Sequence, residues 1–206
     1  MSRSERARPP EKALVSMTVA NIITAAWIVL MLYWIVSARN LKRTARAESL
    51  LTRLAHSLSM VAAYVLLFTD DLPIGPLNSR IVPRNQALTM TGAILTWAGV
   101  AGAIWARAHI GQYWSARVTL KEDHQLIDTG PYAYMRHPIY SGLLLATVGT
   151  AMARDEWRGV VSLAIVLVAL TFKARKEEKL LEGQFGQDYR RYRLSTGFLI
   201  PRFRSL

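Results

Sequence analysis

The sequence contains no cysteine, and this absence removes whole classes of chemistry. Disulfide bonds, zinc sites built on thiolates and thiol nucleophiles are all excluded. There are also only four histidines, His56, His109, His124 and His137, and none stands in an HExxH or similar ligand spacing. A metal site is therefore not expected.

Acidic residues are scarce as well, because 14 Asp and Glu stand against 26 Lys and Arg, a net charge of +12. A chain this basic usually meets nucleic acid or an anionic membrane. Here 51% of the residues are hydrophobic, and the charges gather between long apolar segments. That arrangement favours membrane lipids as partner over nucleic acid, and the sequence indicates no obligate protein partner.

Long apolar segments are what the chain has in abundance. The first, at 13–37, is longer than a signal-peptide core and is followed by ARNLKRTAR instead of a cleavage site. Its length of about 25 residues is enough to cross a bilayer. Further segments lie at 54–69, 86–106, 139–153 and 159–172, the last two separated only by RDEWR. We predict an all-α integral membrane protein with about five transmembrane helices, the last two forming a tight hairpin, or four if that pair is re-entrant.

The distribution of Lys and Arg predicts how these helices are oriented. With five spans, the side that holds 38–53, 107–138 and the tail from 173 carries 18 basic residues, and the other side carries 8. This bias places the C-terminus in the cytoplasm, although the basic N-terminal tail opposes it. The short loops favour a multi-pass protein of a prokaryotic inner membrane.

The tail from 173 alternates charged and apolar residues at helical spacing, which predicts an amphipathic helix broken near Gly183 and Gly186. One interpretation is an interfacial helix whose basic face lies on anionic lipid. That interpretation leaves Glu177 and Glu178 unexplained, because anionic head groups would repel two carboxylates.

The longest non-apolar connection, 107–138, contains enough apolar residues to fold over a ligand. Within it, RVTL at 117–120 and QLIDTGPY at 125–132 predict a short β-pair around a turn at KEDH. The connection runs into GPYAYMRHPIYSG, 130–142, where Arg136 offers a planar fork for a carboxylate or phosphate. Taken alone, this stretch also fits a Pro-capped helix start with interfacial Tyr, Arg and His anchors.

Two motifs in a fixed order carry a resemblance to a known family. GPYxxxRHPxYxG is followed, after the hairpin, by EE-x₂-L-x₃-FG-x₂-Y-x₂-Y and a late Pro. The matching residues are Gly130, Pro131, Tyr132, Arg136, His137, Pro138, Tyr140, Gly142, Glu177, Glu178, Leu181, Phe185, Gly186, Tyr189, Tyr192 and Pro201. In this order and spacing, the chain resembles the isoprenylcysteine carboxyl methyltransferase family of integral-membrane methyltransferases. We therefore divide the chain into N-terminal transmembrane helices on the substrate side, 1–106, and a methyltransferase-like half, 107–206.

The resemblance implies S-adenosylmethionine bound in a cytoplasm-facing pocket made by the 107–138 loop, the RHP segment and the tail. It implies cofactor contacts from His124, Leu126, Gly130, Tyr132, Arg136, His137, Tyr140 and Glu177. It also implies catalytic roles for Glu177, Glu178 and a basic residue just upstream, Lys173 or Arg175, of which Arg175 is our first choice. A carboxylate acceptor needs such a cation to hold it, whereas an amine or hydroxyl acceptor needs a glutamate as base.

The implied function is methyl transfer from S-adenosylmethionine to a lipid-like, membrane-embedded acceptor, above all the carboxyl group of an isoprenylcysteine-type substrate. A phospholipid N-methyltransferase shares the cofactor and the architecture. A sterol-reductase-like enzyme with a nicotinamide cofactor has a similar RHP-type region but a longer chain. The non-enzymatic alternative is a membrane scaffold whose basic tail binds anionic lipid. The residues do not identify the acceptor.

Overall fold

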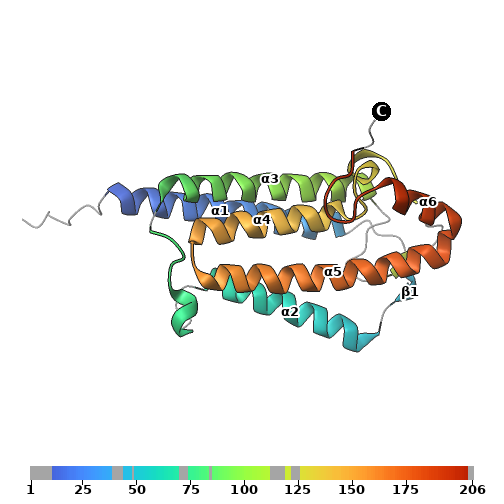
Figure 1. Cartoon of the computed structure of the whole chain (residues 1–206), viewed down its shortest axis with the longest axis horizontal. Coiled ribbons are helices and arrows are strands. Elements are labelled where there is room, and N and C mark those ends of the chain that lie inside the picture. The colour runs from blue at the N-terminus through green and yellow to red at the C-terminus, as the bar shows by residue number, and fades with distance from the viewer. Residues whose placement is uncertain are drawn as a thin grey trace, which may run out of the picture.

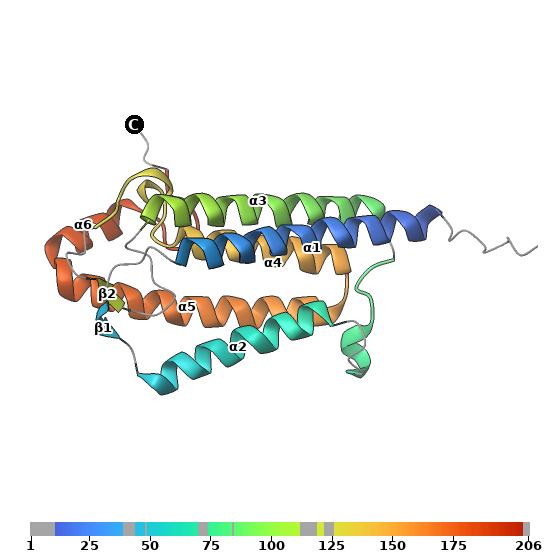
Figure 2. The same cartoon turned by 180° about the vertical axis from the view of Figure 1, so that it is seen from behind.

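A computed structural model describes residues 11–38, 44–47, 49–69, 74–83, 85–111, 119–121 and 126–203. Each apolar segment forms a helix, and the five helices run side by side in one elongated bundle (Figures 1 and 2). They are α1 (Glu11–Ser37), α2 (Leu50–Phe68), α3 (Gln86–Ile110), α4 (Pro138–Arg154) and α5 (Trp157–Phe185). The prediction of an all-α membrane protein with this set of helices is confirmed.

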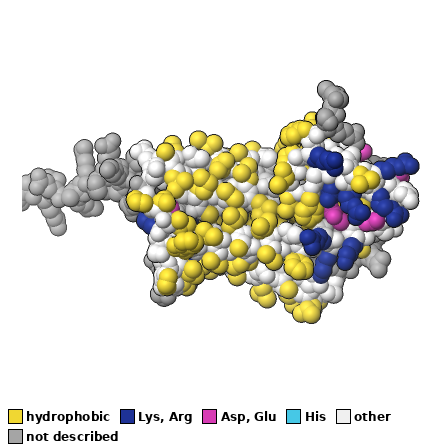
Figure 3. Space-filling model, in the orientation of Figure 1, with side chains coloured by type: hydrophobic (Ala, Val, Ile, Leu, Met, Phe, Trp, Pro, Cys, Tyr) yellow, Lys and Arg dark blue, Asp and Glu magenta, His cyan; other side chains and the backbone are white. Residues whose placement is uncertain are grey.

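Four of these helices, α1, α2, α3 and α5, are long and apolar enough to cross a membrane. The fifth, α4, has 17 residues and lies alongside them in the bundle (Figure 1). Hydrophobic side chains cover the middle of the bundle, while Lys and Arg gather at the end where α5 continues beyond its neighbours (Figure 3). The apolar middle matches the hydrocarbon layer, and the charged end matches an aqueous face.

Helices α3 and α4 pack so closely that their backbones touch. A Cβ atom added to Gly99 would lie 2.3 Å from the backbone nitrogen of Ala146, and one added to Gly149 would lie 2.4 Å from the carbonyl oxygen of Gly92. Small residues permit this approach. Within a bilayer the hydrophobic effect does not drive two helices together, so close backbone packing at small residues stabilises their association. The seam joins a helix of the N-terminal half to the helix that begins with the RHP motif.

The hairpin between α4 and α5 turns at Asp155, whose backbone is left-handed with φ 55°. Its carboxylate pairs with Arg80 at 3.6 Å, and its carbonyl accepts a hydrogen bond from the Ile81 N–H. Buried Arg158 contacts Glu156 and the carbonyl oxygen of Thr69. The predicted tight hairpin is confirmed, and Thr69, Arg80 and Ile81 are bound to it.

Helix α5 continues through the charged segment KARKEE without a break and ends only at Gly186, where φ is +53°. The predicted break near Gly183 is therefore wrong and the one near Gly186 is confirmed, with α6 (Gln187–Ser195) following it. Lys, Arg, Glu and Leu are strong helix formers, so the helix propagates past one glycine at modest cost. As a result, Glu177 and Glu178 are held on a rigid helix.

The predicted strand pair within 117–132 is wrong. Strand β2 (Thr119–Lys121) pairs antiparallel with β1 (Thr44–Ala47), and Gly130–Ala133 forms a 3₁₀ helix, η4. The second segment cannot form a ladder at its end because Gly130 is left-handed at φ +58° and Pro131 has no N–H to donate. Pairing with β1 instead ties the α1–α2 connection to the loop before the RHP motif.

Candidate active site

The two sequence motifs meet in an ion pair between Arg136 and Glu178. Arg136 Nε lies 2.5 Å from Glu178 Oε1, and the two side chains are only 10% and 14% exposed. Arg136 Nη1 also donates hydrogen bonds to the carbonyl oxygens of Thr196, at 2.7 Å, and Arg193, at 3.1 Å. One guanidinium therefore connects the RHP segment, α5 and the C-terminal end of α6, a use of several donors for which Arg is well suited.

His137 and Tyr140 bring the second glutamate into the same cluster. His137 Nε2 lies 3.3 Å from Glu178 Oε1, and its Nδ1 lies 3.8 Å from Glu177 Oε2. The Tyr140 hydroxyl donates a 2.6 Å hydrogen bond to Glu177 Oε1. The Tyr140 ring also stacks on the His137 ring, with an angle of 2° between the two planes. Pro138 starts α4, so His137 and Tyr140 stand one helical turn apart and share a face. We call Arg136, His137, Tyr140, Glu177 and Glu178 the RHP–EE cluster.

The tail after α6 runs back along the RHP segment and fixes its backbone. The N–H groups of Arg136 and His137 donate to the carbonyls of Gly197, at 2.9 Å, and Phe198, at 3.3 Å, while the Gly197 N–H donates to Tyr134 at 3.0 Å. The tail turns sharply here, since a Cβ atom on Gly197 would lie 1.8 Å from the carbonyl oxygen of Ile200. The tail therefore sets the conformation from which two residues of the cluster project.

Three buried tyrosines surround the cluster on the side of α6. Tyr192 donates a 2.8 Å hydrogen bond from its hydroxyl to the carbonyl oxygen of Tyr132. Burial is the main cause that raises the pKa of Tyr132, Tyr189 and Tyr192 above the ordinary value, so all three hydroxyls stay protonated donors at neutral pH. Tyr189 is only 1% exposed, and its hydroxyl has no hydrogen-bond partner in the described part of the chain. A buried donor of this kind is a candidate to bind a ligand.

Gly130, predicted as a cofactor contact, lies against the side chain of His109. A Cβ atom on Gly130 would lie 2.6 Å from His109 Cε1. His109 Nε2 lies 2.9 Å from the Thr129 hydroxyl, and its ring stacks on Tyr132 with centroids 6.3 Å apart. Sequence reasoning missed His109, whose only signal is its place in the last turn of α3 directly before the long loop.

The remaining predicted site residues lie outside the cluster. Leu126 lines a separate cavity of about 630 Å³ beside α6. Arg175 is exposed on α5, about 100° around the helix from Ala174, which is buried toward the core. Lys173, the alternative basic residue, places its Nζ 5.6 Å from the centre of the Tyr140 ring. His124 lies outside the described residues.

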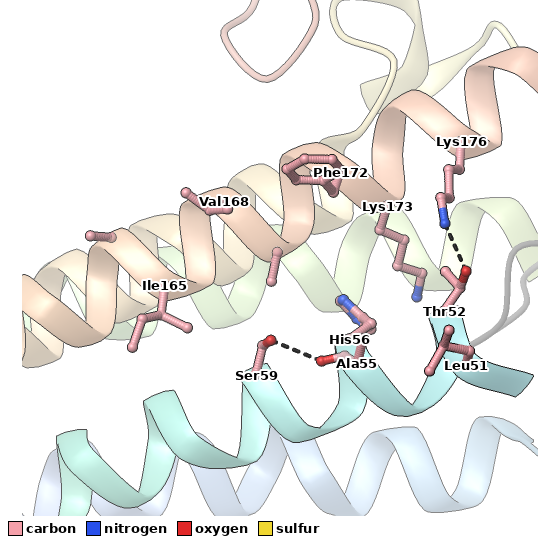
Figure 4. A pocket seen from close by; sticks show the side chains of 12 residues that line it. Leu51, Thr52, Ala55, His56, Ser59, Ile165, Val168, Phe172, Lys173 and Lys176 are labelled. Carbon is pink, nitrogen blue, oxygen red and sulfur yellow. Dashed lines mark hydrogen bonds between the residues drawn. The ribbon is translucent and has the colours of Figure 1, made fainter.

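A second feature adjoins the cluster, an open groove of about 600 Å³ between α2 and α5 (Figure 4). We call it the α2–α5 groove. Its apolar lining comes from Leu51, Ala55, Ala164, Ile165, Val168, Ala169 and Phe172. Its polar lining comes from Thr52, His56, Ser59, Lys173 and Lys176. Lys176 Nζ donates a 2.9 Å hydrogen bond to the Thr52 hydroxyl, which joins the two helices at this point.

Comparison with known proteins agrees with this geometry. The model of the isoprenylcysteine carboxyl methyltransferase (ICMT) family matches residues 92–183, a range that contains the whole RHP–EE cluster. This part of the chain is similar to that family. The expectation of a membrane methyltransferase is thereby confirmed.

Several curated relatives bear the corresponding name. A probable protein-S-isoprenylcysteine O-methyltransferase of Oryza sativa subsp. indica is 29% identical over 163 residues, 78% of this chain and 83% of that protein. The protein-S-isoprenylcysteine O-methyltransferase of Schizosaccharomyces pombe is 36% identical over 101 residues, 47% of this chain and 42% of that protein. Enzyme A of that name from Arabidopsis thaliana is 28% identical over 159 residues, 75% of this chain and 77% of that protein. The Oryza and Arabidopsis matches are long enough to extend into the N-terminal half, before residue 107.

Proposed function

We propose that this protein transfers a methyl group from S-adenosylmethionine to the carboxyl group of a lipid-like acceptor in the membrane, of the isoprenylcysteine type. The observation that carries the proposal is the RHP–EE cluster, in which three donors from one segment hold two adjacent carboxylates of α5. The names of the relatives support the same reaction, because they are isoprenylcysteine O-methyltransferases.

The residues of the cluster fit S-adenosylmethionine, which carries a sulfonium, an ammonium and a carboxylate. Glu177, with 21% of its side chain exposed, offers negative charge to the positive groups. The stacked rings of His137 and Tyr140 offer an aromatic face next to it. The Tyr189 hydroxyl, which has no hydrogen-bond partner among the described residues, supplies a donor for the carboxylate or for a ribose oxygen. The charge and the hydrogen-bonding capacity of these side chains therefore both match S-adenosylmethionine.

In such a reaction the protein mainly has to position the methyl donor and the acceptor relative to each other. When bound, S-adenosylmethionine would supply a methyl group on positively charged sulfur: an acceptor oxygen would form the new bond to the methyl carbon while the carbon–sulfur bond breaks and its electron pair stays on sulfur. Tyr140 holds the Glu177 carboxylate in one orientation, and Arg136 and His137 hold Glu178. Alignment of two bound reactants and exclusion of water are the main rate effects available to an enzyme of this kind.

The cluster suits a carboxylate acceptor better than an amine. A carboxylate is ionised at neutral pH and needs no base, whereas an ammonium must first lose a proton. Glu178 already accepts from Arg136 and lies close to His137, so its oxygens are engaged in holding the RHP segment. Glu177 would be the base for an amine, and it already accepts a hydrogen bond from Tyr140.

The α2–α5 groove supports a lipid-like acceptor. Its wall is mostly apolar, and it lies between two helices whose outer faces carry exposed Leu54, Leu58 and Phe172. Lys173 lines the groove and also lies over the Tyr140 ring, so the groove leads to the RHP–EE cluster. An apolar chain could therefore enter sideways from the bilayer while its head reaches the cluster. The cluster stands at the basic end of the bundle (Figure 3), which supports a cytoplasmic orientation.

Purified protein in lipid nanodiscs tests this function directly. We expect calorimetry to show binding of S-adenosylmethionine and no binding of a reduced nicotinamide cofactor. With methyl-labelled donor and N-acetyl-S-farnesylcysteine, we expect label that mild base releases as methanol, as it does from a methyl ester. Base-stable label on phosphatidylethanolamine would assign N-methylation instead. Failure to bind S-adenosylmethionine would overturn the proposed function.

A further inference from the structure

The end of α6 and the tail that follows it expose a group of large apolar side chains. Leu194, Ile200 and Phe203 are 73%, 79% and 74% exposed, and among the large hydrophobic residues that the structure describes only Leu51 is as exposed. The Phe203 ring lies 5.5 Å from the ring of Tyr134, which is also exposed. We call Tyr134, Leu194, Ile200 and Phe203 the tail patch. An exposed apolar patch of this kind marks a contact with another molecule or with a membrane.

Hydrogen bonds from Arg202 join the parts of the tail patch into one surface. The Arg202 N–H donates to the Tyr134 carbonyl at 2.9 Å, and Arg202 Nη1 donates to the Leu194 carbonyl at 2.8 Å. The neighbouring tail residues Phe198 and Leu199 turn the other way and pack against the buried core. The tail therefore has an inner apolar face that packs against the protein and an outer apolar face that stays exposed.

The tail runs past the point where α4 enters the bundle. The Ser141 hydroxyl, in the first turn of α4, donates to the Leu199 carbonyl at 2.5 Å. Gly197 pairs with Met135, just before that helix begins. In Figure 3 the hydrophobic surface of the bundle continues up to the Lys and Arg side chains at this end. In a membrane such a border lies at the level of the lipid head groups.

Basic residues accompany the tail patch. The segment from α6 to the end of the tail contains four Arg and one Asp. Arg190 and Arg193 pair with Glu182 at 3.8 Å and 3.1 Å. Arg191 and Arg202 are exposed, and neither forms an ion pair within the described part of the chain. Apolar side chains flanked by basic ones are the combination with which an amphipathic segment binds an anionic membrane surface.

We propose that the tail patch inserts into the head-group boundary of the bilayer while Arg191 and Arg202 bind the phosphates of anionic lipids. Lipid fits this surface better than a partner protein, because the tail lies at membrane depth beside α4 and its charge complements anionic head groups. The surface is separate from the RHP–EE cluster and from the α2–α5 groove, so its ligand is neither the methyl donor nor the acceptor.

Lipid binding at the tail patch also bears on the RHP–EE cluster, because the same tail supports it. The carbonyls of Gly197 and Phe198 accept hydrogen bonds from the N–H groups of Arg136 and His137. Resting on the proposed function, S-adenosylmethionine should therefore bind more tightly in anionic than in zwitterionic bilayers. Each arginine strengthens binding to an anionic surface about fivefold. The effect of two arginines on cofactor affinity should thus not exceed about 25-fold.

The absence of cysteine from the chain makes a depth measurement direct. In the Ile200→Cys variant, a nitroxide spin label has a single site of attachment. In nanodiscs that contain phosphatidylglycerol, we expect this label to collide with oxygen, which concentrates in hydrocarbon, more often than with a water-soluble nickel chelate. Gly183→Cys is the matched control, since Gly183 is exposed on α5 and a Cβ atom there meets nothing within 4 Å. Its label should report water.

The role of charge is tested with the same label at position 200. Arg191→Gln and Arg202→Gln should each raise the fraction of phosphatidylglycerol needed to bury the label, and Arg202→Lys should restore the wild-type value. Lys179→Gln, which removes an exposed charge from α5, should leave that fraction unchanged. S-adenosylmethionine affinity in the same nanodiscs should rise as the label becomes buried.

Two results would overturn lipid binding at the tail patch. One is a label at position 200 that is as accessible to water as the label at position 183, and the other is equal burial in anionic and zwitterionic nanodiscs. In nanodiscs that hold two copies, dipolar broadening between labels would instead assign the patch to a second copy of the chain. A buried label in protein that binds no S-adenosylmethionine would refute the proposed function and leave the lipid site standing.

Discussion

Arg136 and Glu178 are 42 residues apart in the chain and meet at 2.5 Å between Nε and Oε1. Each belongs to a different motif, and α4 and most of α5 lie between them in sequence. The pair is largely buried, and Arg136 additionally donates to the carbonyl oxygens of Arg193, in the last turn of α6, and of Thr196, directly after it. The geometry therefore explains why a planar guanidinium, and not just a positive charge, stands at this position.

Replacing Arg136 by Lys should show this requirement. One ammonium cannot reproduce the contacts to Glu178, Thr196 and Arg193, so we expect the melting temperature to fall by several degrees, for a loss of about 2 kcal/mol. Affinity for S-adenosylmethionine should fall as well, because the tail is released from the RHP segment. Arg190→Lys on the exposed face of α6 is the control. An unchanged melting temperature for Arg136→Lys would show that charge alone suffices.

The Glu177→Gln variant tests the donor side of the site. The amide keeps the shape and can still accept from the Tyr140 hydroxyl, but it removes the negative charge. We expect S-adenosylmethionine to bind about tenfold or more weakly by calorimetry in detergent, with stability nearly unchanged. Glu182→Gln is the matched control, because Glu182 pairs with Arg193 at the protein surface. Equal affinities for Glu177→Gln and wild type would remove Glu177 from the cofactor site.

Much of this architecture could be predicted because the signals are local. The long apolar segments predicted the five helices. The order of the two motifs predicted that Arg136, His137 and Tyr140 lie close to Glu177 and Glu178. The strand prediction failed because pairing depends on a partner 77 residues away in the chain, as in Thr44 with Lys121, for which the sequence of 107–138 holds no signal. The roles predicted for His124, Leu126 and Arg175 stay predictions.

The choice between Lys173 and Arg175 shows what sequence spacing leaves open. Both residues precede the two glutamates, and both are basic. Their difference lies in helical phase: at about 100° per residue, Lys173 turns toward α2 and Tyr140, while Arg175 turns to the exposed side. That phase matters only because α5 continues unbroken to Phe185, which the sequence did not predict.

The seam between α3 and α4 gives a stability prediction with an internal control. A Cβ atom on Gly99 would lie 2.3 Å from the Ala146 nitrogen, whereas one on Gly102, three residues on, would meet nothing within 4 Å. Gly99→Ala should force the helices apart and cost about 2 kcal/mol, while Gly102→Ala should be neutral or slightly stabilising. Thermal unfolding in the same detergent measures both. Equal effects of the two substitutions would contradict the close packing of this seam.

A second glycine pair tests the tail. A Cβ atom on Gly197 would lie 1.8 Å from the carbonyl oxygen of Ile200, but one on Gly183, inside α5, would meet nothing within 4 Å. Gly197→Ala should disrupt the backbone hydrogen bonds to Arg136 and His137 and lower S-adenosylmethionine affinity at least tenfold. Gly183→Ala should leave affinity unchanged and stabilise the helix by up to about 1 kcal/mol. Wild-type affinity in Gly197→Ala would show that the tail does not set the RHP conformation.

The hydroxyl of Tyr189 separates a ligand-binding role from a structural one. It is buried, burial raises its pKa further above neutral pH so that it stays protonated, and it has no hydrogen-bond partner among the residues that the structure describes. Removing an unpartnered buried hydroxyl costs a protein little or stabilises it slightly, so Tyr189→Phe should not lower the melting temperature. If this hydroxyl donates to S-adenosylmethionine, the same variant should bind it about fivefold to tenfold more weakly, the value of one neutral hydrogen bond. Tyr192→Phe should behave differently. The Tyr192 hydroxyl already donates a hydrogen bond to the Tyr132 carbonyl oxygen, so loss of that hydroxyl should lower stability. Weaker binding at unchanged stability in Tyr189→Phe alone would therefore place that hydroxyl on the ligand, and unchanged binding would remove it from the site.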